Sequence, residues 1–115
     1  MESVPKFLQG VFGYSGAGLD RSALLASTLI YTVPSSKRAQ FVYLRAGNSG
    51  PELVCLSLVI AGKAARYLPV GAKAGMNVPL TIVEDLPPDT TVEVHLSAPE
   101  GATGQIVVDV GLLEI

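Results

Sequence analysis

The sequence predicts an all-β fold: an antiparallel β-sandwich or jelly roll of six to eight strands with an extended N-terminal arm. Short runs rich in β-branched and aromatic residues recur along the chain, as strands require. Clusters of Gly, Pro, Asn, Asp and Ser separate these runs about every eight to twelve residues. No alternation of strands and helices supports a parallel sheet. We expect two parts, an arm over residues 1–20 and a sandwich domain over residues 21–115.

The stretch from Leu29 to Asn48 is the clearest structural signal in the chain. Leu29–Val33 has high strand propensity, and Pro34 removes a backbone donor where this strand should end. The polar residues that follow are typical of a turn. A second strand is expected over Ala39–Ala46, and the sequence Gly47–Gly50 predicts the next turn.

The first twenty residues do not read as a strand or a helix. They contain four of the twelve glycines, which make an ordered backbone costly. They also contain Phe7, Phe12 and Tyr14, although disordered tails are poor in aromatic residues. We therefore expect an extended arm whose aromatic side chains dock, either on the chain's own core or on a neighbouring subunit or scaffold.

The middle of the chain extends the first of these strands and predicts two more. Asp20–Ser22 could cap a short helix, but the residues that follow favour a strand over Leu24–Val33. The run 53–61 is apolar on both faces, as in a central strand, and its Cys55 is expected to be a small buried hydrophobic residue. A shorter strand is expected over Ala64–Val70.

The C-terminal third predicts three strands and an acidic turn over residues 84–89. Met76–Val83 carries a proline suited to an edge. Thr90–Ala98 alternates, so its valines and Leu96 should point inward and its polar residues outward. In Gln105–Ile115 the inner face is apolar, and Val107 and Leu113 lie on the outer face, so part of that face should be covered.

The charges exclude several classes of function. Only 16% of the residues are charged, so a partner could cover part of the surface. Residues 1–73 hold all eight basic and three acidic residues, whereas residues 74–115 hold seven acidic ones. Either the strands interleave and mix these charges, which we favour, or two opposite surfaces meet in a neighbouring copy. No basic cluster predicts nucleic-acid binding, and no apolar run predicts a membrane span or a signal peptide.

No residue pattern predicts catalysis, a cofactor or a metal. Gly13–Ala17 only loosely matches a nucleophile elbow, which needs a large α/β fold. The single histidine, His95, falls on a solvated strand face. Glu84, Asp85 and Asp89 could bind calcium weakly, but a solvated acidic turn explains them better. We therefore expect a protein that is not an enzyme.

Two short motifs resemble small β-sandwich virion proteins of tailed bacteriophages. One is the Tyr-Thr-Val-Pro, polar turn, Arg-Ala pattern of Ile30–Ala39, followed by a strand and the turn Gly47–Gly50. The other is Leu86–Val92, which is similar to the entry of a late strand in that group. The resemblance covers roughly residues 28–60 and 76–98. It implies a structural virion protein made in the host cytoplasm.

Within that group, a capsid decoration (cement) protein is the leading hypothesis. Such a protein would bind the major capsid protein or another virion protein and stabilise the shell by binding only the assembled lattice. A homo-oligomer is expected, with a trimer suggested by analogy with threefold sites. Two alternatives stay open: a tail, neck or fibre accessory protein, and a carbohydrate- or receptor-binding module. The expected partner-binding residues are Phe7, Phe12, Tyr14, Arg38 and Arg45.

Overall fold

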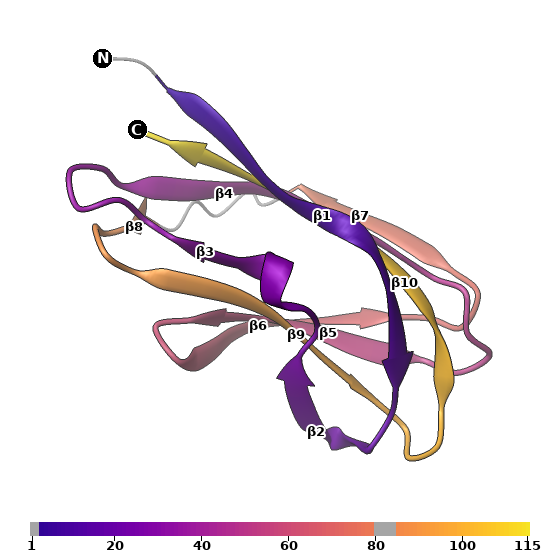
Figure 1. Cartoon of the computed structure of the whole chain (residues 1–115). Helices are drawn as coiled ribbons and strands as arrows, with labels where there is room; N and C mark the ends of the chain where they lie inside the picture. Colours follow the sequence, from indigo (N-terminus) through magenta and orange to yellow (C-terminus); the bar gives the residue numbers. More distant parts are fainter. Residues whose placement is uncertain (1–2, 80–84) are drawn as a thin grey trace.

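The computed structural model describes residues 3–79 and 85–115, which form two antiparallel sheets packed face to face (Figure 1). The first, sheet A, has the order β1 (Val4–Ser15), β10 (Thr103–Glu114), β4 (Ala39–Asn48) and β7 (Gly75–Pro79), with β8 (Asp85–Leu86) also paired to β4. The second, sheet B, has the order β2 (Gly18–Leu24), β9 (Thr91–Ala98), β5 (Val54–Ile60) and β6 (Lys63–Val70), with β3 (Ile30–Thr32) also paired to β9. The predicted β-sandwich is confirmed, with ten strands in the described residues.

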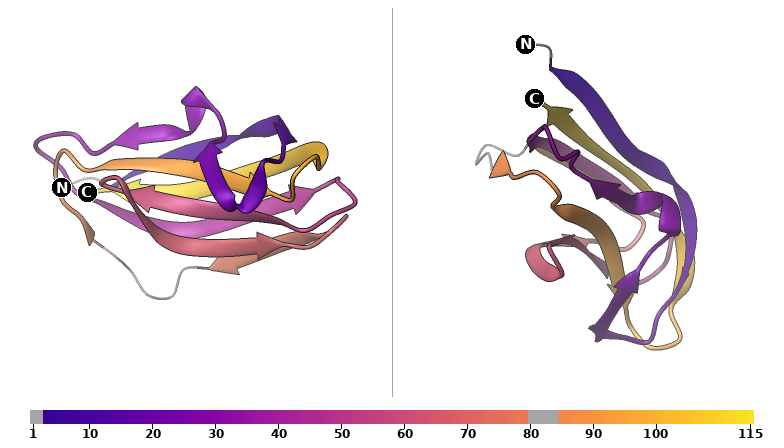
Figure 2. Two further views of the ribbon diagram at one scale, coloured as in Figure 1. Left: turned by 90° about the horizontal axis from the view of Figure 1, so that it is seen from below. Right: turned by 60° about the vertical axis from the view of Figure 1, so that its left-hand side comes forward.

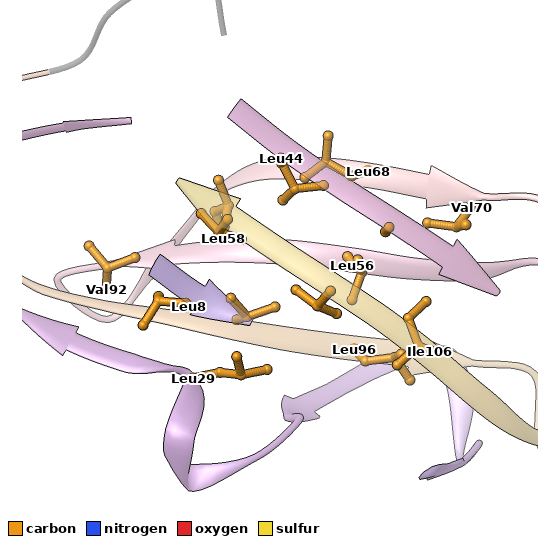
Figure 3. Close-up of a cluster of buried hydrophobic side chains, with 14 of the residues drawn as sticks. Leu8, Leu29, Leu44, Leu56, Leu58, Leu68, Val70, Val92, Leu96 and Ile106 are labelled. Carbon is orange, nitrogen blue, oxygen red and sulfur yellow. The ribbon is translucent and has the colours of Figure 1, made fainter. Parts of the chain in front are cut away.

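The core lies between the sheets and follows the period-2 pattern of the sequence. Alternate residues of β10 and β4 face alternate residues of β5 and β9, because successive side chains of a strand point to opposite faces. Leu44, Leu56, Leu58, Val92 and Ile106 are fully buried there (Figure 3). The predicted inward-facing residues of β9 and β10 are therefore confirmed.

The strand at the N-terminus corrects one expectation. Residues 4–15 form β1, which pairs with β10 in continuous register from Val4–Glu114 to Ser15–Thr103. The glycines are compatible with this strand because the whole β10 ladder supports it, and the ring of Phe12 lies over Gly10. The prediction that residues 1–20 form neither strand nor helix is wrong.

The segment between β2 and β3 corrects a second expectation. A continuous strand over Leu24–Val33 was predicted, but a 3₁₀ turn, η1 (Ser27–Leu29), interrupts it. The interruption buries the side chain of Leu29 completely in the core. Of the predicted strand Met76–Val83, residues 76–79 lie in β7 and the remainder falls outside the described residues, as does Glu84.

A buried hydrogen-bond network holds the turn after β4. Asn48 Oδ1 accepts hydrogen bonds from Tyr14 Oη (2.7 Å) and from the backbone N–H of Gly50 (2.9 Å). Asn48 Nδ2 donates to the backbone oxygens of Glu52 (2.8 Å) and Gly71 (3.3 Å). One side chain thus ties β1 to the turn after β4 and to the loop after β6.

Two long strands of sheet A, β1 and β10, lie side by side along one side of the core. β1 and β10 bend together over the rest of the molecule, and the start of β1 lies beside the end of β10 (Figure 2). Among the described residues, no helix has the length and apolar character needed to cross a membrane.

Candidate functional site

The outward-facing side of sheet A, here called the outer face, carries three rows of residues that cross neighbouring strands. The cross-strand register places Val11, Val107, Gly47 and Gly75 side by side on β1, β10, β4 and β7. The next row along the strands holds Gln9, Asp109, Arg45 and Asn77. The third row holds Phe7, Gly111, Tyr43 and Pro79.

Large apolar side chains on this face are exposed to solvent. The exposed fractions are 52% for Phe7, 60% for Val11 and 49% for Val107. Val42, the extra residue at a register shift in β4, is 48% exposed. Scattered exposed apolar residues are ordinary, but these belong to adjacent strands of one sheet. The outer face therefore gathers exposed apolar side chains from three neighbouring strands, β1, β10 and β4.

A shallow hollow, here called the valine hollow, lies within the outer face. It has a volume of about 340 Å³. Val11 and Val107 form its apolar walls, and Gly47 and Gly75 contribute no side chains to fill it. Lys73 and other polar residues line its rim. The hollow could receive one apolar side chain, with a carboxylate beside it paired to Lys73.

The middle row of the outer face carries balanced charges. Arg45 Nη2 lies 2.9 Å from Asp109 Oδ2, and Tyr43 Oη donates to Asp109 Oδ1 at 2.9 Å. The guanidinium of Arg45 lies 4.7 Å from the centroid of the Tyr43 ring. Its pKa is raised, first by the hydrogen bond with Tyr43 and then by the charge of Asp109. The middle row therefore presents polar groups on the outer face without adding net charge to that face.

The ring of Tyr43 lies flat because Gly111 has no side chain. A Cβ atom at Gly111 would overlap the Tyr43 ring. The ring is thereby covered by β10 on one side, while Arg45 lies over it within cation–π distance. A tyrosine ring held in this way lies along the sheet and does not project from the outer face.

The structure brings together two of the five predicted partner-binding residues. Phe7 and Arg45 both lie on the outer face, in neighbouring rows. Phe12 packs against the core, and Tyr14 is buried in the Asn48 network, where burial and then the charge of Glu52 raise its pKa. For these two aromatic residues the structure shows docking on the chain's own core.

The predicted basic residues both find acidic partners within the chain. Arg38 lies immediately before β4, with its Nη1 atom 3.4 Å from Asp85 Oδ2, and Arg45 pairs with Asp109. Each pair joins the basic first part of the sequence to the acidic last part. This agrees with the interpretation that strands interleave and mix the charges.

The outward side of sheet B has fewer features of a binding site than the outer face of sheet A. The outward side of sheet B carries Tyr67, which is 70% exposed. His95 is half-buried and lies 2.8 Å from a carboxylate oxygen of Glu93. Cys55 is half-buried rather than fully buried. Over residues 3–79 and 85–115, no three His, Cys, Asp or Glu side chains gather into a possible metal site.

Sequence reasoning missed the valine hollow, although one signal pointed towards it. Val107 was recognised as an apolar residue on an outward-facing position of the last strand. Val11 was hidden because the glycine-rich segment around it was not recognised as a strand. Gly47 was predicted to begin a turn, whereas it lies in β4 and the register places it beside Gly75 of β7.

Comparisons with known proteins agree on the fold. No family model and no curated protein matches the chain. A solved CBM36-1 domain of a multidomain xylanase from the hindgut metagenome of Trinervitermes trinervoides is similar, with a TM-score of 0.58 and 12% identity over 96% of each chain. A carbohydrate-binding module CBM36 solved with calcium and xylotriose gives a TM-score of 0.57 and 12% identity, covering 94% of this chain and 97% of that one.

A viral protein shares the same architecture. A structure of the infectious bursal disease virus Gx strain gives a TM-score of 0.53 at 12% identity, covering 99% of this chain and 32% of that one. At such identities these likenesses establish a shared sandwich fold alone. One fold of this kind supports many functions, so the function must be argued from the site.

Proposed function

We propose that the protein is a non-catalytic structural subunit of a virion that docks through the outer face of sheet A on a larger protein assembly. A capsid decoration protein on a tailed-phage shell is the preferred form of this role, and a tail, neck or fibre accessory is the other. The observation that carries the proposal is the exposure of Phe7, Val11 and Val107 on adjacent strands.

The chemistry of the outer face suits a protein partner. Apolar area removed from water contributes about 25 cal/mol per Å². The charges of Arg45 and Asp109 already neutralise each other, so docking need not strip water from an unpaired ion. The partner should offer an apolar side chain to the valine hollow and an acidic residue near Lys73.

Binding to purified phage shells tests this proposal. The probe is the empty expanded shell of the major capsid protein encoded in the same genome, and the measurement is co-sedimentation. Val107→Lys places a charge in the valine hollow on a central strand, where the backbone ladder stays intact. We expect it to weaken shell binding at least about tenfold, which corresponds to about 1.4 kcal/mol.

The matched control is Tyr67→Lys, because it adds the same charge to the opposite side of the sandwich. This variant should bind as the wild type does. Absence of wild-type binding to shells and to isolated tails would contradict the virion role. Equal binding by the Val107→Lys variant would contradict docking through the outer face.

Carbohydrate binding is the second candidate function, and the full-length likeness to two carbohydrate-binding modules favours it. The outer face offers the polar groups of Arg45, Asp109 and Gln9, but Tyr43 lies flat and partly covered rather than open for stacking. A glycan array separates the two functions. Strong, specific glycan binding by the isolated protein, lost in Arg45→Ala, would favour this candidate over shell docking.

A further inference from the structure

Within residues 3–79 and 85–115, no strand pairs with the outer edge of β1, which is here called the open edge. The backbone orientation of β1 follows from the hydrogen bonds of β10. Gln105 donates its backbone N–H to Ser49 Oγ (3.0 Å), and its carbonyl oxygen accepts the backbone N–H of Ser49 (3.0 Å). The backbone of Gln105 therefore faces the β4 side. Because backbone groups alternate in direction along a strand, those of its neighbours Gly104 and Ile106 face β1.

This alternation fixes which groups of β1 are free. Ile106 lies opposite Phe12, so even-numbered residues of β1 exchange hydrogen bonds with β10. Odd-numbered residues consequently direct their N–H and C=O groups to the open edge of sheet A, while their side chains lie on the outer face. Pro5, which has no N–H, occupies one of these edge positions, as edge strands permit.

The open edge lacks the usual protection against pairing. Natural edge strands are kept apart by short length, charges, prolines or bulges. β1 is 12 residues long with an unbroken register, and residues 7–15 contain no charge and no proline. By contrast, β6 carries Lys63 and Arg66, β2 carries Asp20 and Arg21, and β7 has five residues.

We propose that β1 pairs antiparallel with β1 of a second copy of this chain, which joins two sheets A into one continuous sheet. Pairing of one strand with itself has twofold symmetry and closes without an open end. The uncharged stretch brings no like charges opposite each other. The symmetry and the lack of charge both favour a second copy of this chain over a foreign peptide as the strand that pairs with the open edge.

The exposed side chains select the register. When Gln9 lies opposite Gln9, Phe7 of each copy lies opposite Val11 of the other. Both residues point to the outer face and both are more than half exposed in the single chain. An aromatic side chain opposite a β-branched one is a favourable cross-strand pair. The outer faces of the two copies then form one surface that carries two valine hollows.

The mass of the full chain in solution tests this pairing. Light scattering should give twice the 12.0 kDa of one chain for the wild type. Gln9→Pro removes an N–H from the open edge but none from the β1–β10 ladder, so this variant should have the mass of one chain. Gln9→Ala keeps the N–H and should remain paired, which separates the backbone from the side chain.

Hydrogen exchange of the wild type gives an independent reading if the proline variant does not fold. The edge amides of Phe7, Gln9 and Val11 should exchange at least about tenfold more slowly in concentrated than in dilute protein. A wild-type mass of one chain at all concentrations would overturn the proposal, as would a folded Gln9→Pro variant of doubled mass. Protection of the edge only when shells are added would assign it to another protein instead.

This inference stands apart from shell docking. Val107→Lys should retain the doubled mass while losing shell binding, because Val107 lies on β10 and has no backbone group at the open edge. A wild-type protein that binds shells but has the mass of one chain at all concentrations would overturn the edge proposal alone.

Discussion

Replacing Asn48 with alanine should destabilise the sandwich far more than replacing the tyrosine that bonds to it. The Asn48 side chain is 4% exposed and makes strong hydrogen bonds to Tyr14, Gly50 and Glu52, with a longer one to Gly71. Asn48→Ala removes all of them and leaves buried polar groups without partners. Tyr14→Phe removes one bond, and Asn48 Oδ1 still accepts from Gly50.

The magnitudes follow from the number of bonds lost. One intramolecular hydrogen bond contributes about 1 kcal/mol net, so Tyr14→Phe should cost about 1 kcal/mol and Asn48→Ala about 4 kcal/mol. A chain of 115 residues unfolds with an entropy of about 0.24 kcal/mol/K, so these losses correspond to Tm decreases of about 4 °C and about 17 °C.

Urea unfolding followed by circular dichroism, together with calorimetry, measures both values. The stability of an ordinary domain, about 5–15 kcal/mol, leaves the Asn48→Ala variant folded in most of that range. Equal losses for the two variants, both near 1 kcal/mol, would refute the reasoning that Asn48 organises the turn after β4. If Asn48→Ala does not fold, Asn48→Ser replaces it in the comparison. Its loss of stability should lie between about 1 and about 4 kcal/mol.

Three further predictions concern single side chains. Burial, and then a hydrogen bond to the carboxylate of Glu114, raise the pKa of Tyr31 above 10.0. The contribution of Tyr31 to stability is therefore complete below pH 10 and is lost as the pH rises further. Tyr31→Phe should flatten this alkaline decline of stability in urea titrations. Gly111→Ala should cost about 1–3 kcal/mol by displacing the Tyr43 ring, and Tyr43→Ala should relieve most of that cost in a double-mutant cycle. Arg45→Ala breaks an exposed ion pair with Asp109 and should change the free energy of unfolding by less than about 1 kcal/mol.

Strands with clean alternation could be predicted from the sequence. β9 and β10 alternate apolar and polar residues, and the predicted inward-facing residues are buried in the structure. The start of β4 at Ala39 was predicted correctly, but the strand continues to Asn48, past the predicted end at Ala46, because its ladder with β10 extends that far. Where the period-2 pattern agrees with the packing, a local rule is sufficient.

β1 could not be predicted because its stability is not local. Glycines at positions 10 and 13 disfavour a strand on their own, and only the 12-residue ladder with β10, a hundred residues away in sequence, supports it. The same separation along the sequence prevented prediction of the site. Val11 and Val107 are neighbours only through that register, and the role of Tyr14 depends on Asn48, which lies 34 residues further along the chain.

Footprinting of side chains by hydroxyl radicals, on free protein and on protein bound to phage shells, tests the docking surface most directly. We expect Phe7 and Val107 on the outer face to lose reactivity on binding, while Tyr67 on the opposite side keeps its reactivity. Protection of Tyr67 with unchanged reactivity at Val107 would contradict docking through the outer face of sheet A.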